Sequence, residues 1–214
     1  TFSTWVNPES SSWEVLMGKT GVSTGYLMLH NNNQISFKDS SSVYGYSDVN
    51  VFNEGELNHI VVTADSTGIT YYSNGLEVGT GLSTVPTDIV FRDIFAADQR
   101  YGEGFTDEVS IFNTTLTLTE VLELYNSGSA LDARDHSQSG NLEGYWRNNG
   151  TDQWDDLSVH AWTGTVNGSP STITLQEGIL FGKDSLGLPM NRVRSKGLNP
   201  GGNGYAEVAS DVSL

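Results

Sequence analysis

The sequence predicts an all-β fold, a two-sheet sandwich with one short helix. Apolar and β-branched runs of strand length recur along the chain, turn residues separate them, and 24 of the 214 residues are Gly. Only one segment has the spacing of an amphipathic helix. The clearest strands are 26–30, 34–38, 59–64, 69–72 and 88–91, and 1–8, 105–111 and 142–147 are further strand-like runs.

Two Asn-containing segments between these runs are predicted to be turns. They are Asn31–Asn33 and Ser73–Gly75. An Asn-Gly pair tolerates the positive φ angles of a type I′ turn, which matches the twist of a β-hairpin. The second segment therefore predicts a tight hairpin.

The segment 117–127 is the predicted helix. Thr117 is placed to cap it, and Glu120 is the reciprocal partner of a capping box. Gly128 is expected to end it. The apolar residues at helical spacing are Val121, Leu122 and Tyr125.

Four segments, taken in order, resemble motifs of the laminin G-like, concanavalin A-like family of jelly rolls. They are Thr1–Pro8 with Trp5, Leu57–Asp65, Thr70–Val78 and Gly104–Tyr125. Leu57 stands where the family motif has an aromatic residue. The resemblance covers residues 1–128 and implies a two-sheet jelly roll for 1–130, followed by a linker and an accessory strand or loop region over 131–196.

The segment 197–214 resembles the opening strand of the same family, which normally precedes the strand that holds Trp5. The strand order is therefore expected to be permuted. Three alternatives follow: the strand completes its own sandwich, it completes the sandwich of a neighbouring subunit, or the chain is one repeat of a tandem array. Thr1 lies inside a strand pattern, which leaves open whether residues precede it. The residues expected to make this strand are Leu198, Tyr205, Val208, Val212 and Leu214.

Composition excludes several classes of function. The formal net charge is −16, from 10 Lys and Arg against 26 Asp and Glu, so binding to nucleic acids or to anionic membranes is not expected. No apolar run is long enough to predict membrane insertion. Without Cys, the chain forms no disulfides or zinc–thiolate sites. Most of the carboxylates are expected to be solvated.

No enzymatic motif is found. Retaining glycoside hydrolases that resemble this fold carry E-x-D-x-E or E-x-D-x-x-E on one strand, and neither pattern occurs here. Glu54 and Glu56 lie in a turn-like sequence and are expected to be solvated. No nucleophile elbow, metalloprotease motif or phosphate-binding Gly loop occurs either. The chain is therefore expected not to be an enzyme.

Asp107 is the candidate metal ligand. The resemblance implies a structural calcium ion in some relatives, held by the Asp that opens the last strand. Backbone carbonyls of 202–204 would complete that site. Asp107 bonded only to a nearby turn is the alternative.

Exposed aromatic rings are the candidates for glycan binding, because they stack on the apolar faces of sugars. Packing of these rings within the protein is the alternative for each. The candidates, which lie in loop-like contexts, are Tyr44, Tyr46, Tyr101, Trp154 and Trp162.

We therefore expect a non-enzymatic structural or adhesive module, on a phage virion or in an extracellular assembly, that self-associates through residues 197–214. The alternative is a lectin-like, carbohydrate-binding module with structural calcium. A glycoside hydrolase or polysaccharide lyase of the same fold is the third, least favoured reading.

Overall fold

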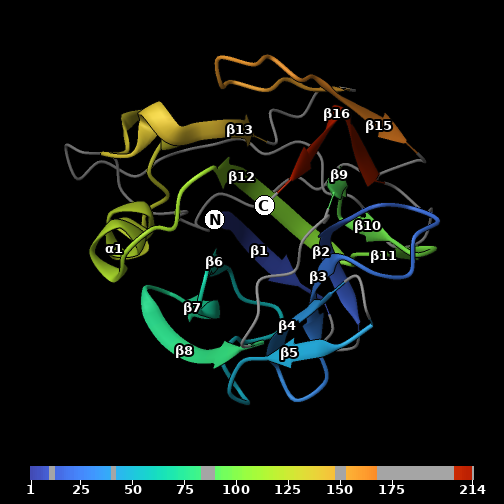
Figure 1. Cartoon of the computed structure of the whole chain (residues 1–214), viewed down its shortest axis with the longest axis vertical. Coiled ribbons are helices and arrows are strands. Elements are labelled where there is room, and N and C mark those ends of the chain that lie inside the picture. The colour runs from blue at the N-terminus through green and yellow to red at the C-terminus, as the bar shows by residue number, and fades with distance from the viewer. Residues whose placement is uncertain (10–12, 40–41, 83–89, 148–152, 168–204, 214) are drawn as a thin grey trace.

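The computed structural model describes residues 1–9, 13–39, 42–82, 90–147, 153–167 and 205–213. Their strands form two antiparallel sheets, and one short α-helix lies on the outside (Figure 1). This arrangement confirms the predicted all-β jelly-roll sandwich. Among these residues, no helix combines the length and the hydrophobicity needed to cross a membrane.

The first sheet has six strands, in the order β13-β12-β1-β6-β7-β8. Asn74 and Gly75 have φ angles of 51° and 78° between β7 and β8, as the Asn-Gly prediction requires. The strands are β1 (Phe2–Pro8), β6 (Asn58–Asp65), β7 (Gly68–Ser73), β8 (Leu76–Gly81), β12 (Gly104–Phe112) and β13 (Leu142–Trp146).

The second sheet has eight strands, in the order β14-β15-β16-β9-β2-β3-β4-β5. A separate two-stranded hairpin, β10–β11, follows β9. The strands are β2 (Glu14–Gly18), β3 (Tyr26–His30), β4 (Gln34–Lys38), β5 (Tyr44–Tyr46), β9 (Val90–Ile94), β10 (Ala96–Ala97), β11 (Arg100–Tyr101), β14 (Gln153–Trp154), β15 (Gly164–Asn167) and β16 (Tyr205–Ser213).

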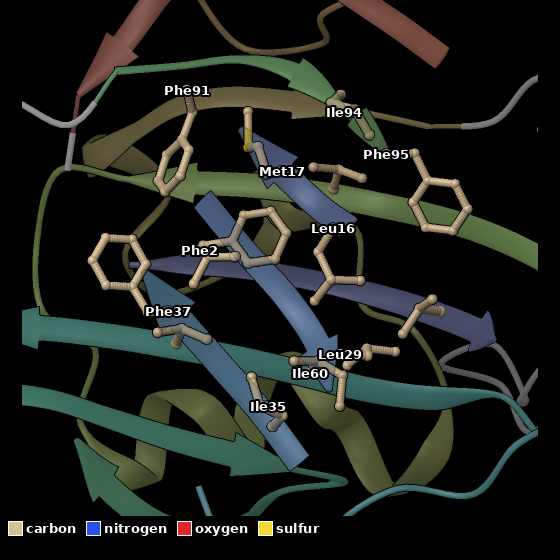
Figure 2. Close-up of a cluster of buried hydrophobic side chains, with 14 of the residues drawn as sticks. Phe2, Leu16, Met17, Leu29, Ile35, Phe37, Ile60, Phe91, Ile94 and Phe95 are labelled. Carbon is tan, nitrogen blue, oxygen red and sulfur yellow. The ribbon is translucent and has the colours of Figure 1, made fainter. Parts of the chain in front are cut away.

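The core lies between the sheets and follows from the alternation of side chains along each strand. On β3, Leu27 and Leu29 belong to the main core cluster, whereas Tyr26 and Met28 belong to a separate cluster on the other side of the strand. Each fully buried apolar side chain stabilises the fold by about 1.5–3 kcal/mol. Figure 2 shows side chains of both sheets in the core cluster, among them Phe2, Leu29, Ile35, Phe37 and Ile60.

The helix α1 (Leu118–Tyr125) begins where the sequence predicts. Thr117 and Glu120 form the capping box. The predicted end is wrong: Asn126 adopts the left-handed conformation at the C-cap, and a 3₁₀ turn, η1 (Asn126–Gly128), follows. Asn is the second choice after Gly for this conformation. The helix packs through Val121 and Leu124 against a cluster that contains Val61, Tyr72 and Phe112.

Residues 131–147 and 153–167 pack on the sandwich instead of extending away from it. Two 3₁₀ turns, η2 (Ala133–Asp135) and η3 (Ser139–Asn141), precede β13, which pairs with β12. The carboxylate of Asp156 then fixes the following loop, because it accepts hydrogen bonds from the backbone N–H groups of three residues. These are Tyr145, Ser158 and Trp162.

The strand β16 lies between β9 and β15 of the same chain (Figure 1, red). Its pairing with β9 has an irregular register between Glu207 and Val212. Of the residues expected for the assembly strand, Tyr205, Val208 and Val212 are in β16, whereas Leu198 and Leu214 lie outside the described residues. Pairing between copies of the chain stays a prediction.

Candidate functional site

Two of the candidate ligand-binding residues lie side by side on β5, at the edge of the eight-stranded sheet. The rings of Tyr44 and Tyr46 are stacked, with centroids 5.7 Å apart. The Tyr46 side chain is 38% exposed, and that of Tyr44 is half-buried. Their position at a sheet edge leaves ring surface available to a ligand.

The register of the sheet brings further side chains to the same face, since directly paired residues of antiparallel strands point the same way. Tyr26 pairs with Lys38, which in turn pairs with Tyr44. The hydroxyl groups of Tyr26 and Tyr44 are 3.3 Å apart. Burial is the main cause that raises the pKa of Tyr26, so its hydroxyl stays protonated and can donate a hydrogen bond.

Trp13 and His30 complete this group of rings. The ring of Trp13 meets that of His30 edge-on, with centroids 4.2 Å apart, and His30 meets Tyr46 edge-on at 5.1 Å. We call this group of rings, made of Trp13, Tyr26, His30, Tyr44 and Tyr46, the aromatic face. Tyr26 is only 1% exposed, so the other four rings supply the accessible surface of this face. Sequence reasoning missed Trp13, which lies immediately before β2, and the other two rings on β3.

The hairpin β10–β11 borders the aromatic face. A Cβ at Gly18 would lie 2.4 Å from the Cβ of Ala97 and 2.8 Å from that of Tyr26, so only Gly permits this approach. The hairpin carries the guanidinium of Arg100 over the ring of Trp13, 4.7 Å from its centroid. The close packing at Gly18 therefore positions a cation on the face.

Lys38 supplies a second cation. Its ammonium lies 5.4 Å from the ring centroid of Tyr26 and 5.3 Å from that of Tyr44. It also donates a hydrogen bond of 2.6 Å to the backbone carbonyl of Ser23. These contacts hold the charge on the face and restrict the lysine side chain.

Polar atoms without partners lie within the face. Both ring nitrogens of His30 and the hydroxyl oxygen of Ser36, which is paired with Tyr46, are buried and accept or donate no hydrogen bond among the described residues. Burial lowers the pKa of His30, and the nearby backbone of Asn31 partly offsets this, so the ring is neutral near pH 7. A neutral imidazole has one donor and one acceptor, but both nitrogens of His30 are covered by neighbouring groups of the protein.

The other three aromatic candidates lie elsewhere. Trp154 is 2% exposed and belongs to the core cluster, so the expectation that it stacks on a ligand is corrected to a packing role. Trp162 packs against that cluster and stacks on His160 at 4.6 Å. Tyr101, half-buried on β11, pairs with Ala96. The loop-like sequence around Trp154 hid its packing.

Asp107 is also buried, with 2% of its surface exposed. Its Oδ1 accepts a hydrogen bond of 2.8 Å from the backbone N–H of Glu108. Within the described ranges, no group of three or more His, Asp or Glu side chains is arranged to hold a metal ion. The carbonyls of 202–204 lie outside those ranges, so calcium stays a prediction.

The remaining features offer less to a ligand. Glu54 and Glu56 lie in an exposed turn, and Asn53 donates a hydrogen bond to the Glu56 carboxylate. An open hollow of about 390 Å³ lies at the turn end of β7 and β8, lined by residues 67–70 and 80–82. This lining has hydroxyl and backbone groups, but no aromatic ring and no ionisable side chain. The aromatic face is therefore the stronger candidate.

Comparisons with known proteins agree with this fold. No match to the sequence was found among curated proteins. One similar solved structure is domain 4 of AbnA, a GH43 extracellular arabinanase from Geobacillus stearothermophilus, in complex with arabinotriose. It has 18% identity and a TM-score of 0.46, and the match covers 58% of this chain and 65% of that one.

A second similar structure is a proposed carbohydrate-binding protein from Bacteroides ovatus ATCC 8483. It has 15% identity and a TM-score of 0.56, and the match covers 77% of this chain and 50% of that one. The chain thus spans less than two thirds of either structure. Residues 1–122, more than half of the chain, match a laminin G family of the lectin/glucanase class. The chain therefore belongs to the concanavalin A-like lectin/glucanases superfamily.

Proposed function

We propose that this chain is a carbohydrate-binding, lectin-like module that binds sugars on the aromatic face. The observation that carries the proposal is the convergence of five rings from Trp13, β3 and β5 on one side of a sheet. Aromatic rings stack on the apolar faces of sugars, and neighbouring polar groups bond to the sugar hydroxyls. The exposed guanidinium of Arg100, which lies over the ring of Trp13, supplies such donors.

The superfamily, which includes lectins and glucanases, and the proposed carbohydrate binding of the Bacteroides ovatus protein support this reading. A binding module needs no catalytic carboxylates, and no glycosidase-type carboxylate pattern occurs in the sequence. Sugar polymers lie at cell surfaces and in extracellular matrices, so the proposal includes an extracellular or surface location. Turnover of laminarin, agarose or alginate would instead favour an enzyme.

A glycan array followed by titration calorimetry tests the proposal. Trp13→Ala and Tyr46→Ala should each weaken binding about 3- to 10-fold, since an aromatic contact contributes about 0.5–1.5 kcal/mol. Leu76→Ser is the control, because Leu76 is 68% exposed on β8 of the other sheet. Absence of any glycan ligand, or unchanged affinity in both ring variants, would contradict the proposal.

A second function, a structural or adhesive module of a virion or extracellular assembly, is favoured by β16. This strand enters the middle of the sheet from a distant part of the sequence. The same strand of another copy has the backbone pattern to fill that place, which would link copies into rings or filaments. A calcium ion on Asp107 and the carbonyls of 202–204 would strengthen either function. Added calcium would then raise the thermal midpoint of the wild type more than that of Asp107→Asn.

A further inference from the structure

Two cations of the aromatic face differ from other cations of the chain. Arg92, Arg134 and Arg147 each pair with a carboxylate at 2.7–3.1 Å. Lys38 and Arg100 form no ion pair with any described residue. In a chain with 26 acidic and 10 basic side chains, carboxylate partners are abundant. Unpaired cations at these two positions therefore need another explanation.

Contacts with the rings explain where both cations lie, but they do not use the N–H hydrogen-bond donors of Lys38 and Arg100. Lys38 uses one of its three N–H donors on the carbonyl of Ser23. Arg100, which is exposed, lies over Trp13 with its fork of five donors. Asp98, in the same hairpin, acts on Tyr26 but lies beyond ion-pair distance of either cation. Donors thus remain for a ligand.

The two cations act on the same part of the surface. Lys38 lies over the rings of Tyr26 and Tyr44. Arg100 lies over the ring of Trp13, which in turn contacts the ring of His30 on the same strand as Tyr26, β3. A ligand stacked on the rings therefore lies within reach of positive charge, in a molecule whose net charge of −16 repels anions elsewhere.

From this geometry we infer that the aromatic face selects sugars that carry an anionic group, a carboxylate or a sulfate, and that Lys38 and Arg100 read that group. The inference rests on the proposed carbohydrate-binding function and gives it a substrate class. Charge-assisted hydrogen bonds to an oxyanion are about twice as strong as neutral ones. Neutral sugars would use the rings and offer both cations only uncharged hydroxyl acceptors.

The test compares sugars that differ only in charge. β-1,4-linked mannotetraose and tetramannuronate share a backbone and differ at C6, which is a hydroxymethyl group in the first and a carboxylate in the second. A sulfated galactan oligosaccharide and its desulfated form make the second pair. By titration calorimetry, at least one acidic member should bind about tenfold more tightly than its neutral partner. Added salt should weaken that preference.

Arg100→Gln and Lys38→Gln should each reduce the preference about 3- to 10-fold, because each weakens binding of the acidic sugar more than binding of the neutral one. Arg134→Gln removes the same charge from a site away from the aromatic face. It should change neither the affinity for the acidic sugar nor that for the neutral one. Circular dichroism checks that each variant is folded, and the salt dependence of the wild type gives a readout that needs no variant. The pair that shows the larger preference for its acidic member identifies the anionic group as carboxylate or sulfate.

Equal affinity for acidic and neutral members of both pairs would overturn the inference and leave the proposed function standing. Equal weakening of both members in the two variants would also overturn it, since the cations would then only support the rings. Failure of these four oligosaccharides and of every sugar on the glycan array to bind would remove the proposed function and this inference together.

Discussion

His59 is the most deeply buried histidine among the described residues. Its ring packs against those of Trp5 and Tyr125, with centroids 4.9 and 5.9 Å away, and its Nε2 is 2.9 Å from the hydroxyl of Ser3. Burial lowers the pKa of His59 from 6.5 to about 3. The ring is therefore neutral in the folded protein over a range in which the unfolded chain takes up a proton.

This shift makes folding sensitive to acid. Because the unfolded state binds the proton first, the free energy of unfolding should fall as the pH drops below about 6.5. The loss should continue down to about pH 3, by at most about 1.4 kcal/mol per pH unit. Urea unfolding between pH 7 and 4.5 measures the slope. His59→Gln should flatten it, whereas His160→Gln, at an exposed position, should not. Identical slopes in the wild type and His59→Gln would refute the assignment.

At the scale of elements, the hairpin β10–β11 depends on a single missing side chain. Gly18→Ala would place a Cβ against the Cβ atoms of Ala97 and Tyr26, neither of which is the end of a flexible chain. The variant should lose about 1–3 kcal/mol of stability, as overpacked sites do. It should also bind glycans more weakly, because the hairpin that carries Arg100 must shift.

Gly140→Ala is the matched control, since a Cβ there meets no atom within 4 Å. Thermal unfolding and glycan titration of the two variants give the comparison. Normal stability and normal affinity in Gly18→Ala would mean that β2 accommodates the methyl group without moving the hairpin.

The elements that could be predicted from the sequence are those whose causes are local. The turn at Asn74 and Gly75 follows from the φ angles that these residues tolerate, and the start of α1 follows from Thr117 and Glu120. The aromatic face depends on register instead. Tyr44 and Tyr46 were candidates from the sequence. Trp13 lies near them only because β3 and β4 place β5 and the start of β2 in the same sheet, with these rings on the same face.

The same limit explains the misplaced candidate on β14. Trp154 lies in a polar stretch that reads as a loop, and nothing in its neighbours indicates burial. β14 pairs with β15, and Trp154 thereby joins the main core cluster. Most of the other members of that cluster come from strands that are distant from Trp154 in the sequence. When distant segments bury a side chain, the residues next to it in the sequence do not predict that burial.

At the scale of the whole molecule, β16 fills a central place in the larger sheet. A chain ending at Lys196 lacks this strand and should leave the pairing edges of β9 and β15 open. Light scattering and urea unfolding of both chains test its role. A monomeric full-length chain that is destabilised by truncation indicates closure within one copy. Large oligomers that dissociate on truncation indicate exchange between copies, whereas an unaltered truncated chain would contradict both.

The position of β16 also has a kinetic consequence. Ala206 pairs with Ile94, while hairpins such as β3–β4 and β7–β8 form between neighbours. Contacts between distant positions form slowly, because closing the intervening loop costs conformational entropy before any strand pairing can offset that cost. During synthesis, the edge of β9 that pairs with β16 therefore stays unpaired until residues 205–213 have left the ribosome. The order of strands along the chain thus sets how long the nascent protein remains vulnerable to wrong pairing.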